Sequence, residues 1–316
     1  MPVKMFLAAY NPSMSVTAAQ PAARQAFLAG LAIAVIGAVL FSAKAVVAKL
    51  IYRYDVDAVT LIAFRMLFSL PFFAAIAVWQ SRTGAPLSRR DYVRIAVLGL
   101  LGYYLSSFLD FLGLQYITAG LERLILFLTP SFVLLISVVF LRKTITGMEW
   151  LALGTAYLGT ILVFVQDARS GGSNVLLGGA FVLGSAVSYA LYLLLSGEMV
   201  RRVGALRLVG YAMCVSSAAC ILQFFILRPP SMLLQPMPVY WLSLVNAVFC
   251  TVLPVFLTMV AVARIGAASA SQAGMIGPVS TLFLAAWILS EPITAVQLIG
   301  TGLVLLGIFL LSKKKV

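Results

Sequence analysis

The stretch TAGLERLILFLTPSFVLLISVVFL, from Thr118 to Leu141, decides the fold of this chain. It is apolar and long enough to cross a bilayer, which takes about 20 residues of helix. It nevertheless carries an acid and a base, Glu122 and Arg123, near its start, and a proline, Pro130, at its middle. Charged side chains within a membrane span are costly, and they face the protein interior or a water-filled cavity. The stretch therefore predicts a membrane protein with a polar interior.

A similar apolar stretch with a proline near its middle occurs 148 residues later, from Ala267 to Leu289, but it has no charged residue. The same offset aligns identical residues along the whole chain. These pairs are Gly30 with Gly178, Ala38 with Ala186, Val39 with Val187, Ala119 with Ala267, Pro130 with Pro278, Thr146 with Thr294, Gly154 with Gly302 and Gly159 with Gly307. We therefore interpret the chain as two copies of one unit, of which only the first is charged within the membrane.

The composition supports an integral membrane protein. The 316 residues are 63% hydrophobic and only 10% charged, whereas soluble domains carry about 25% charged residues. The net charge of +13 fits the excess of Lys and Arg in cytoplasmic loops, so we expect no nucleic-acid partner. The three cysteines lie in apolar runs and there is no histidine, which excludes a disulfide framework and the usual metal sites.

The apolar pattern predicts ten membrane-spanning helices and an all-α fold. The predicted spans are 26–50, 58–79, 92–115, 118–141, 147–165, 175–197, 205–227, 238–263, 267–289 and 293–312. They divide into a cytoplasmic N-terminal tail (1–25), a first five-helix repeat (26–165) and a second five-helix repeat (175–312).

The distribution of Lys and Arg predicts the orientation. With the N-terminus in the cytoplasm, fifteen of the 22 basic residues lie on the inner side, four on the outer side and three within the membrane. Both termini are then cytoplasmic, and we expect the cell membrane as the location. Because each repeat has an odd number of spans, the second copy is inverted relative to the first. Inverted repeats are typical of alternating-access carriers, which bind substrate between the copies.

Three patterns in this sequence resemble the EamA family of the drug/metabolite transporter superfamily. They are LFSAKAVVAKL (40–50), AGLERLILFLTP (119–130) and PVSTLFLAAWILSEPITAVQLIGTGLVLLGI (278–308). The resemblance covers about residues 26–312 and implies ten helices in two inverted repeats around a central cavity, in a protein that exports or exchanges small metabolites. The sequence departs from the pattern where Lys143-Thr144 stands opposite Glu291-Pro292 of the second half.

Five charged residues of the first repeat are the main candidates for substrate binding: Lys44, Arg65, Asp110, Glu122 and Arg123. At about 1.5 Å per helical residue, all five lie in the outer half of the bilayer, so we expect a charged outer vestibule and a neutral inner one. Three cations against two carboxylates leave one positive charge for an anionic group, which Arg65 is suited to hold bidentately. The alternative is that the charges only tie helices together. Glu122 and Arg123 lie about 100° apart on a helix, so we expect one in the cavity and the other against a neighbour or lipid headgroups.

Uncharged candidates complete the predicted site. Tyr103, Tyr189 and Tyr192 are aromatic residues within spans that can stack on a substrate or pack between helices, and Asn246 and Gln272 are lone amides within the membrane. Pro130 and Pro278 permit kinks and are candidates for gating.

These features predict a secondary transporter that exports a small polar or anionic, amino-acid-like metabolite. One alternative is a nucleotide-sugar or phosphate-ester exchanger of the same superfamily. Another is a membrane-embedded lipid-modifying enzyme, but its acid–base or metal residues are missing from the sequence. We expect no cofactor and no metal, a small metabolite and membrane lipid as partners, and a monomer or a homodimer. Glu122 or Asp110 is the candidate for proton coupling, because burial raises a carboxylate pKa.

Overall fold

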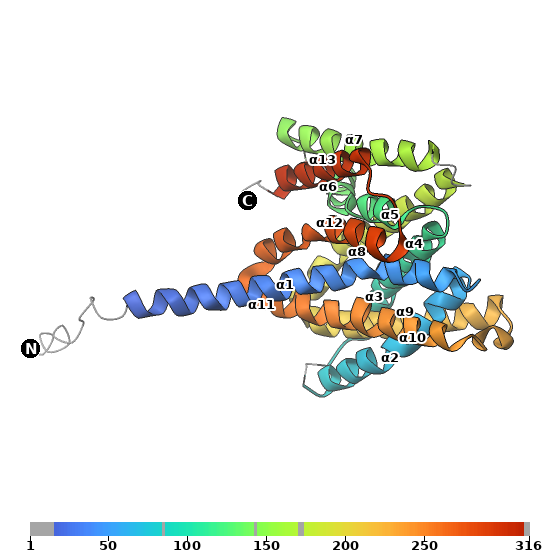
Figure 1. Cartoon of the computed structure of the whole chain (residues 1–316). Helices are drawn as coiled ribbons and strands as arrows, with labels where there is room; N and C mark the ends of the chain where they lie inside the picture. Colours follow the sequence, from blue (N-terminus) through green and yellow to red (C-terminus); the bar gives the residue numbers. More distant parts are fainter. Residues whose placement is uncertain (1–15, 84–85, 142–143, 170–173, 313–316) are drawn as a thin grey trace, which may run out of the picture.

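The computed structural model describes residues 16–83, 86–141, 144–169 and 174–312, and within these ranges it consists of helices and connecting loops (Figure 1). The first half contains α1 (Val16–Tyr52), α2 (Ala58–Thr83), α3 (Arg89–Gly99), η1 (Leu100–Leu105), α4 (Ser106–Leu114), α5 (Ala119–Leu126), α6 (Thr129–Leu141) and α7 (Gly147–Arg169). The second half contains α8 (Val175–Val203), α9 (Ala205–Leu227), η2 (Pro230–Leu233), α10 (Met237–Ala247), η3 (Val248–Val252), α11 (Leu253–Gly274), α12 (Ile276–Leu284), η4 (Ala285–Leu289) and α13 (Ala295–Ser312).

The predicted all-helical membrane fold is confirmed. Nine helical segments of the described residues are long and apolar enough to cross a membrane, and they correspond to the first nine predicted spans. The tenth predicted span, 293–312, corresponds to the shorter apolar helix Ala295–Leu311. The bilayer thickness sets the length of these helices, which is why hydropathy alone locates them.

The predicted N-terminal tail (1–25) lies partly within α1. Residues 16–25 form the first turns of this helix, and residues 1–15 lie outside the described residues. Figure 1 shows the first turns of α1 projecting beyond the other helices. The apolar stretch that begins near residue 26 marks where the helix meets the hydrophobic body, not where the helix begins.

Two helices break at equivalent places. The fourth span is interrupted between α5 and α6, and the ninth between α11 and α12 at Met275, which lies 148 residues after Phe127. Pro130 and Pro278 explain both breaks, because a proline ring collides with the carbonyl group four residues earlier. Those carbonyl groups belong to Leu126 and Gly274, the last residues of α5 and α11.

Two other local features also recur at this offset. The π-helical segment η1 in the third span begins at Leu100, and η3 in the eighth span begins at Val248. The helices α7 and α13 start with equivalent capping boxes: the Thr146 amide donates to Glu149 Oε2 (2.7 Å), and the Thr294 amide donates to Gln297 Oε1 (3.1 Å). These reciprocal bonds satisfy backbone N–H groups that a helix start leaves free.

The packing of helices is symmetric between the halves. α2 packs on α9, and α7 packs on α13. The contacts of α4 and α6 with α8 are matched by those of α11 and α12 with α1, and α3 with α9 is matched by α10 with α2. Each helix of one half therefore has its counterpart in the other half, and α1 and α8 occupy equivalent central places.

Glycines allow the closest of these approaches. A Cβ atom at Gly159 of α7 would lie 2.5 Å from the Gly300 carbonyl oxygen of α13, and one at Gly113 of α4 would lie 2.6 Å from the Gly178 carbonyl oxygen of α8. Both distances are too short for a side chain, so the sequence needs glycine there for backbone contact between helices.

Candidate functional site

The five charged residues predicted to bind substrate lie together in the interior. We call Lys44 (α1), Arg65 (α2), Asp110 (α4), Glu122 and Arg123 (both α5) the charge cluster. None of these residues is more than 5% exposed, and Glu122 is 0% exposed. The packed helices therefore bury all five side chains, which line no open vestibule in this conformation.

Lys44 connects both carboxylates of the cluster. Its ammonium group donates a short hydrogen bond to Asp110 Oδ2 and lies 3.4 Å from Glu122 Oε1. Burying a charge without a partner costs several kcal/mol, and one lysine is the ionic partner of two acids that come from different helices. This pairing ties α1, α4 and α5 together.

The two arginines have no carboxylate within 4 Å among the residues described. Arg65 Nε donates to Thr251 Oγ1 (2.8 Å) and Arg65 Nη1 to Ser107 Oγ (3.4 Å), while Arg123 Nη2 donates to Ser42 Oγ (3.3 Å). We expected one unpaired cation and find two, both bound to hydroxyl groups.

Glu122 and Arg123 are both directed into the protein, Glu122 toward the other charges and Arg123 against neighbouring helices. Both are buried in α5. Glu122 approaches Lys44, and Arg123 lies against α1 and against Gly277, where a Cβ atom would be 2.8 Å from Arg123 Nη2. The absence of a side chain at Gly277 of α12 leaves room for Arg123.

Two aromatic rings each contact two cations of the cluster. The Phe111 ring is near Lys44 Nζ (5.4 Å to the centroid) and Arg65 Cζ (5.1 Å), and the Phe41 ring is near Lys44 Nζ (5.4 Å) and Arg123 Cζ (4.8 Å). The ring faces stabilise the cations. Sequence reasoning missed both rings, since a phenylalanine in an apolar span carries no distinguishing signal.

The second half also contributes to this site. Asn246 of α10 donates from Nδ2 to the Lys44 carbonyl oxygen (3.3 Å), and Thr251 of η3 accepts from Arg65. Asn246, a candidate from the sequence, therefore contacts the backbone of a member of the charge cluster. Thr251 was missed, although it stands 148 residues after Tyr103, and this correspondence is the signal that could have found it.

Several buried oxygens of the site have no hydrogen-bond donor in the described part of the chain. These atoms are Asp110 Oδ1, both carboxylate oxygens of Glu122, and Asn246 Oδ1. The Nε group of Arg123 is a buried donor of the same site that has no acceptor among the described residues. Buried polar atoms normally have a partner. These atoms make the charge cluster the candidate binding site.

The predicted tyrosines form a second cluster, between η1 and α8. The hydroxyl groups of Tyr103 and Tyr192 are 3.1 Å apart, and the ring of Tyr189 stacks on that of Tyr192 with centroids 5.5 Å apart. Gly102 lies directly against Tyr192, since a Cβ atom there would be 2.3 Å from the ring. The tyrosines are therefore packed between helices in this conformation.

Within the described residues, no hydrogen bond or ion pair joins the remaining candidates to the charged groups of the cluster. Gln272 is exposed in the last turns of α11. Pro130 and Pro278 lie in the first turns of α6 and α12, directly after the helix breaks.

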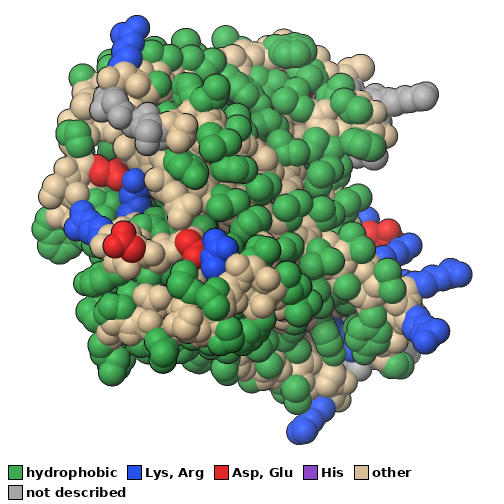
Figure 2. All heavy atoms as spheres, turned by 90° about the vertical axis from the view of Figure 1, so that its right-hand side faces the viewer, with side chains coloured by type: hydrophobic (Ala, Val, Ile, Leu, Met, Phe, Trp, Pro, Cys, Tyr) green, Lys and Arg blue, Asp and Glu red, His purple; other side chains and the backbone are tan. Residues whose placement is uncertain are grey.

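Ionic contacts also join the two halves at the end of the molecule where α1 ends. Lys49 lies 3.6 Å from Glu291 Oε1, which also accepts from the Ala119 amide (3.4 Å), and Arg53 donates to the Leu289 carbonyl oxygen (3.2 Å). Figure 2 shows basic and acidic side chains side by side on this otherwise mainly apolar face. Burial raises the pKa of Glu291 more than Lys49 and the Ala119 amide lower it.

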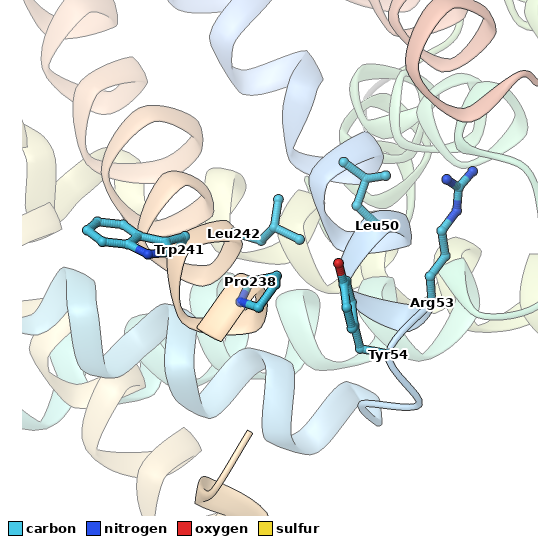
Figure 3. A pocket seen from close by; sticks show the side chains of 6 residues that line it. All are labelled: Leu50, Arg53, Tyr54, Pro238, Trp241 and Leu242. Atoms are coloured by element: carbon cyan, nitrogen blue, oxygen red, sulfur yellow. The ribbon is translucent and has the colours of Figure 1, made fainter. Parts of the chain in front are cut away.

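A shallow pocket of about 430 Å³ lies on the same end, between the end of α1 and the start of α10 (Figure 3). Leu50, Arg53, Tyr54, Pro238, Trp241 and Leu242 line it. No member of the charge cluster lines this pocket. No group of three or more His, Cys, Asp or Glu side chains in the described ranges is arranged to hold a metal ion.

Comparison with known proteins gives consistent matches. The model of the EamA-like transporter family matches residues 28–165 and again residues 176–313. The chain is 30% identical to "Uncharacterized transporter YcbK" of Bacillus subtilis (strain 168), over 87% of this chain and 89% of the relative. It is 26% identical to an "Uncharacterized transporter" of Archaeoglobus fulgidus, over 77% of this chain and 84% of the relative. A solved structure described as "Crystal structure of protein" has the same fold, with a TM-score of 0.61 at 17% identity over 90% of this chain and 96% of that one.

Proposed function

We propose that this chain, which belongs to the EamA-like transporter family, is a secondary transporter that exports a small polar or anionic, amino-acid-like metabolite by alternating access. The chain is a multi-pass membrane protein, and its family and relatives make it a transporter rather than an enzyme. The substrate class, the direction of transport and the mechanism are the proposal.

The observation that carries the proposal is the burial of five ionisable side chains where helices of both halves meet. Charges within a membrane are retained at the substrate and ion pathways of transport proteins. Carriers with repeated halves bind their substrates at the interface between the repeats. The charge cluster, with Thr251 and Asn246 from the second half, has this position.

The charges favour a small polar substrate with an anionic group. Three cations and two carboxylates leave a net charge of +1 in the cluster. Arg65 and Arg123 are bound to hydroxyl groups only, so a substrate carboxylate can replace these weaker acceptors with charge-assisted bonds. Tyr103, Tyr189 and Tyr192 are proposed to contact substrate after the cluster opens, and Gln272 to lie along the route.

Alternating access fits two inverted repeats, residues 26–165 and 175–312. The contacts of Lys49 and Arg53 with Glu291 and Leu289 close the end that we assign to the outside. Both termini and the other end are then cytoplasmic, and the membrane is the cell membrane. The breaks before Pro130 and Pro278 are the proposed gating points, and Glu122 or Asp110 is the proposed group for proton coupling.

A phosphate-ester exchanger is the second candidate, since the cluster contains three cations. The free carboxylate oxygens of Asp110 and Glu122 disfavour it, because they would repel a phosphate. An anionic substrate that also carries hydrogen-bond donors suits the site better.

The test begins with a metabolite survey of cells with and without the protein, followed by counterflow of the accumulated or depleted compound in liposomes. We expect Arg65→Gln to lower counterflow about 10–100-fold, the value of one charge-assisted bond. Arg82→Gln, at the exposed end of the same helix, is the matched control and leaves counterflow unchanged. Equal counterflow by both variants, or no difference between the metabolite profiles, contradicts the proposal.

A further inference from the structure

We propose that Asp110, Glu122 and Asn246 form a subsite for a protonated primary amine, and that the Lys44 side chain occupies this subsite in the closed conformation. The inference rests on the proposed function and assigns to the ligand an ammonium group. Lys44 then acts as a tethered competitor of the ligand.

The free atoms of the site determine which group fits it. Asp110 Oδ1, Glu122 Oε1 and Oε2, and Asn246 Oδ1 are buried acceptors without donors in the part of the chain that the structure describes. An ammonium group offers three donors and no acceptor. A phosphate or carboxylate group offers acceptors and would leave these oxygens unsatisfied. The excess of acceptors therefore selects a cationic donor group.

The Lys44 ammonium satisfies only part of this demand. It donates to Asp110 Oδ2 and approaches Glu122 Oε1 at 3.4 Å, outside hydrogen-bond geometry. The side chain of Lys44 reaches from α1 toward α4 and α5. The backbone carbonyl oxygen of Lys44 accepts a hydrogen bond from Asn246 Nδ2. A ligand ammonium is free of this tether, so it can approach the unpartnered oxygens that Lys44 leaves unused.

Charge balance explains why a lysine stands here. Lys44 is the cation within ion-pair distance of both buried carboxylates, and removing one partner of a buried ion pair is strongly destabilising. Lys44 supplies the positive charge while the site is empty, and a bound ammonium supplies it when the site is occupied. The exchange of one cation for the other leaves the net charge of the cluster unchanged.

The exchange takes place where the two halves meet. α1 packs on α11 and α12, and Asn246 of α10 holds the backbone of Lys44. The residue whose side chain occupies the subsite is therefore also in backbone contact with the second half. Ligand binding is coupled in this way to the helix that links them.

The experiment uses the purified full-length Lys44→Ala variant and the probe n-propylammonium, whose three carbons and nitrogen replace the atoms that the substitution removes. We expect millimolar n-propylammonium at pH 7 to raise the thermal unfolding midpoint of Lys44→Ala, by on the order of 3 °C at about ten times Kd. The wild-type protein requires at least about tenfold more amine, because Lys44 fills its subsite.

Matched probes and variants isolate the subsite. n-Propanol and propionate have the same carbon chain without the positive charge, and neither should raise the midpoint. Lys49 is a partly exposed lysine of the same helix and pairs with Glu291. n-Propylammonium should not raise the midpoint of the Lys49→Ala variant. The triple variant Lys44→Ala/Asp110→Asn/Glu122→Gln should also lose the response. A response shared by these controls overturns the proposal.

Absence of a response in Lys44→Ala also overturns the proposal. If acidification alone restores its stability, a proton rather than an amine satisfies the carboxylates. If Lys44→Ala cannot be isolated, it is expressed and solubilised with n-propylammonium or n-propanol; recovery of monodisperse protein with the amine only supports the subsite, and recovery with neither contradicts it. The thermal shift measures amine binding and does not depend on transport. The amine-subsite proposal can therefore be contradicted while counterflow persists, and counterflow can be absent while the amine binds.

Discussion

At the scale of single residues, the arrangement of the site depends on which group each charged side chain contacts. The sequence places five ionisable residues at similar depth but does not assign their partners. In the structure Lys44 pairs with both carboxylates, whereas Arg65 and Arg123 donate hydrogen bonds to hydroxyl groups. Serine and threonine occur throughout the spans, so Ser42 and Thr251 become recognisable as partners only when the helices pack.

Asp57 provides a residue-scale prediction outside the membrane spans. Burial by itself would raise its pKa, but hydrogen bonds from Arg228 and from the Thr60 amide outweigh burial, and the pKa lies below its ordinary value. The ionised form is therefore favoured by folding. The contribution to stability is complete above the unfolded pKa of about 3.9 and is lost as the pH falls through the lower folded pKa.

We expect Asp57→Asn to lower the thermal midpoint at pH 7 relative to the wild type, because it breaks the pair with Arg228. The difference should shrink as the pH is lowered toward 3. Midpoints of both proteins across this pH range in detergent provide the measurement. Asp55→Asn, in the same loop, is the control. A gap between wild type and Asp57→Asn that stays constant with pH contradicts the assignment.

At the scale of helices, breaks and caps recur where the sequence repeats. Pro130 and Pro278 predict interruptions, and the structure places these interruptions at the carbonyl groups four residues earlier. The π-helical segments η1 and η3 were not predicted, because no residue type in LLGYYL or VFCTV specifies an i to i+5 pattern. These segments, which contain Gly102 and Thr251, are recognised only in the three-dimensional structure.

The glycines of α7 give a prediction at this scale. A Cβ atom at Gly159 would lie 2.5 Å from the Gly300 carbonyl oxygen, whereas one at Gly154 meets nothing within 4 Å. We expect Gly159→Ala to destabilise the protein by about 1–3 kcal/mol, as overpacking does. Gly154→Ala should be neutral or stabilising by up to about 1 kcal/mol, because alanine favours helix.

Thermal unfolding of the two variants tests this pair directly. Both substitutions add the same methyl group to the same helix, so their intrinsic helix propensities cancel in the comparison. Equal midpoints would mean that α7 and α13 do not approach as closely as the structure shows.

At the scale of the whole molecule, symmetric packing brings residues of both halves around the charge cluster. The first half supplies the charges, and the second supplies Thr251, Asn246 and the backbone near Gly277. At the end of the molecule where α1 ends, Lys49 and Glu291 join the halves across 3.6 Å. Opening this end in the proposed cycle requires breaking that pair.

Topology is the prediction for the whole molecule. We expect a fluorescent reporter that folds only in the cytoplasm to be active when fused to either terminus, because the excess of Lys and Arg keeps both ends inside. A phosphatase active only outside should be active after Gln235, in the η2–α10 connection. Termini on opposite sides of the membrane would contradict the inverted arrangement.

The sequence by itself determined the number, place and apolar length of most helices, because bilayer thickness and hydropathy act on each span independently. It also determined the breaks at Pro130 and Pro278, which are local steric effects. Only the tertiary structure decided that Glu122 and Arg123 are both buried, that one lysine joins two carboxylates, and that the tyrosines pack against η1. The physical reason is that side-chain partners depend on distances between helices far apart in sequence, and helix packing fixes those distances.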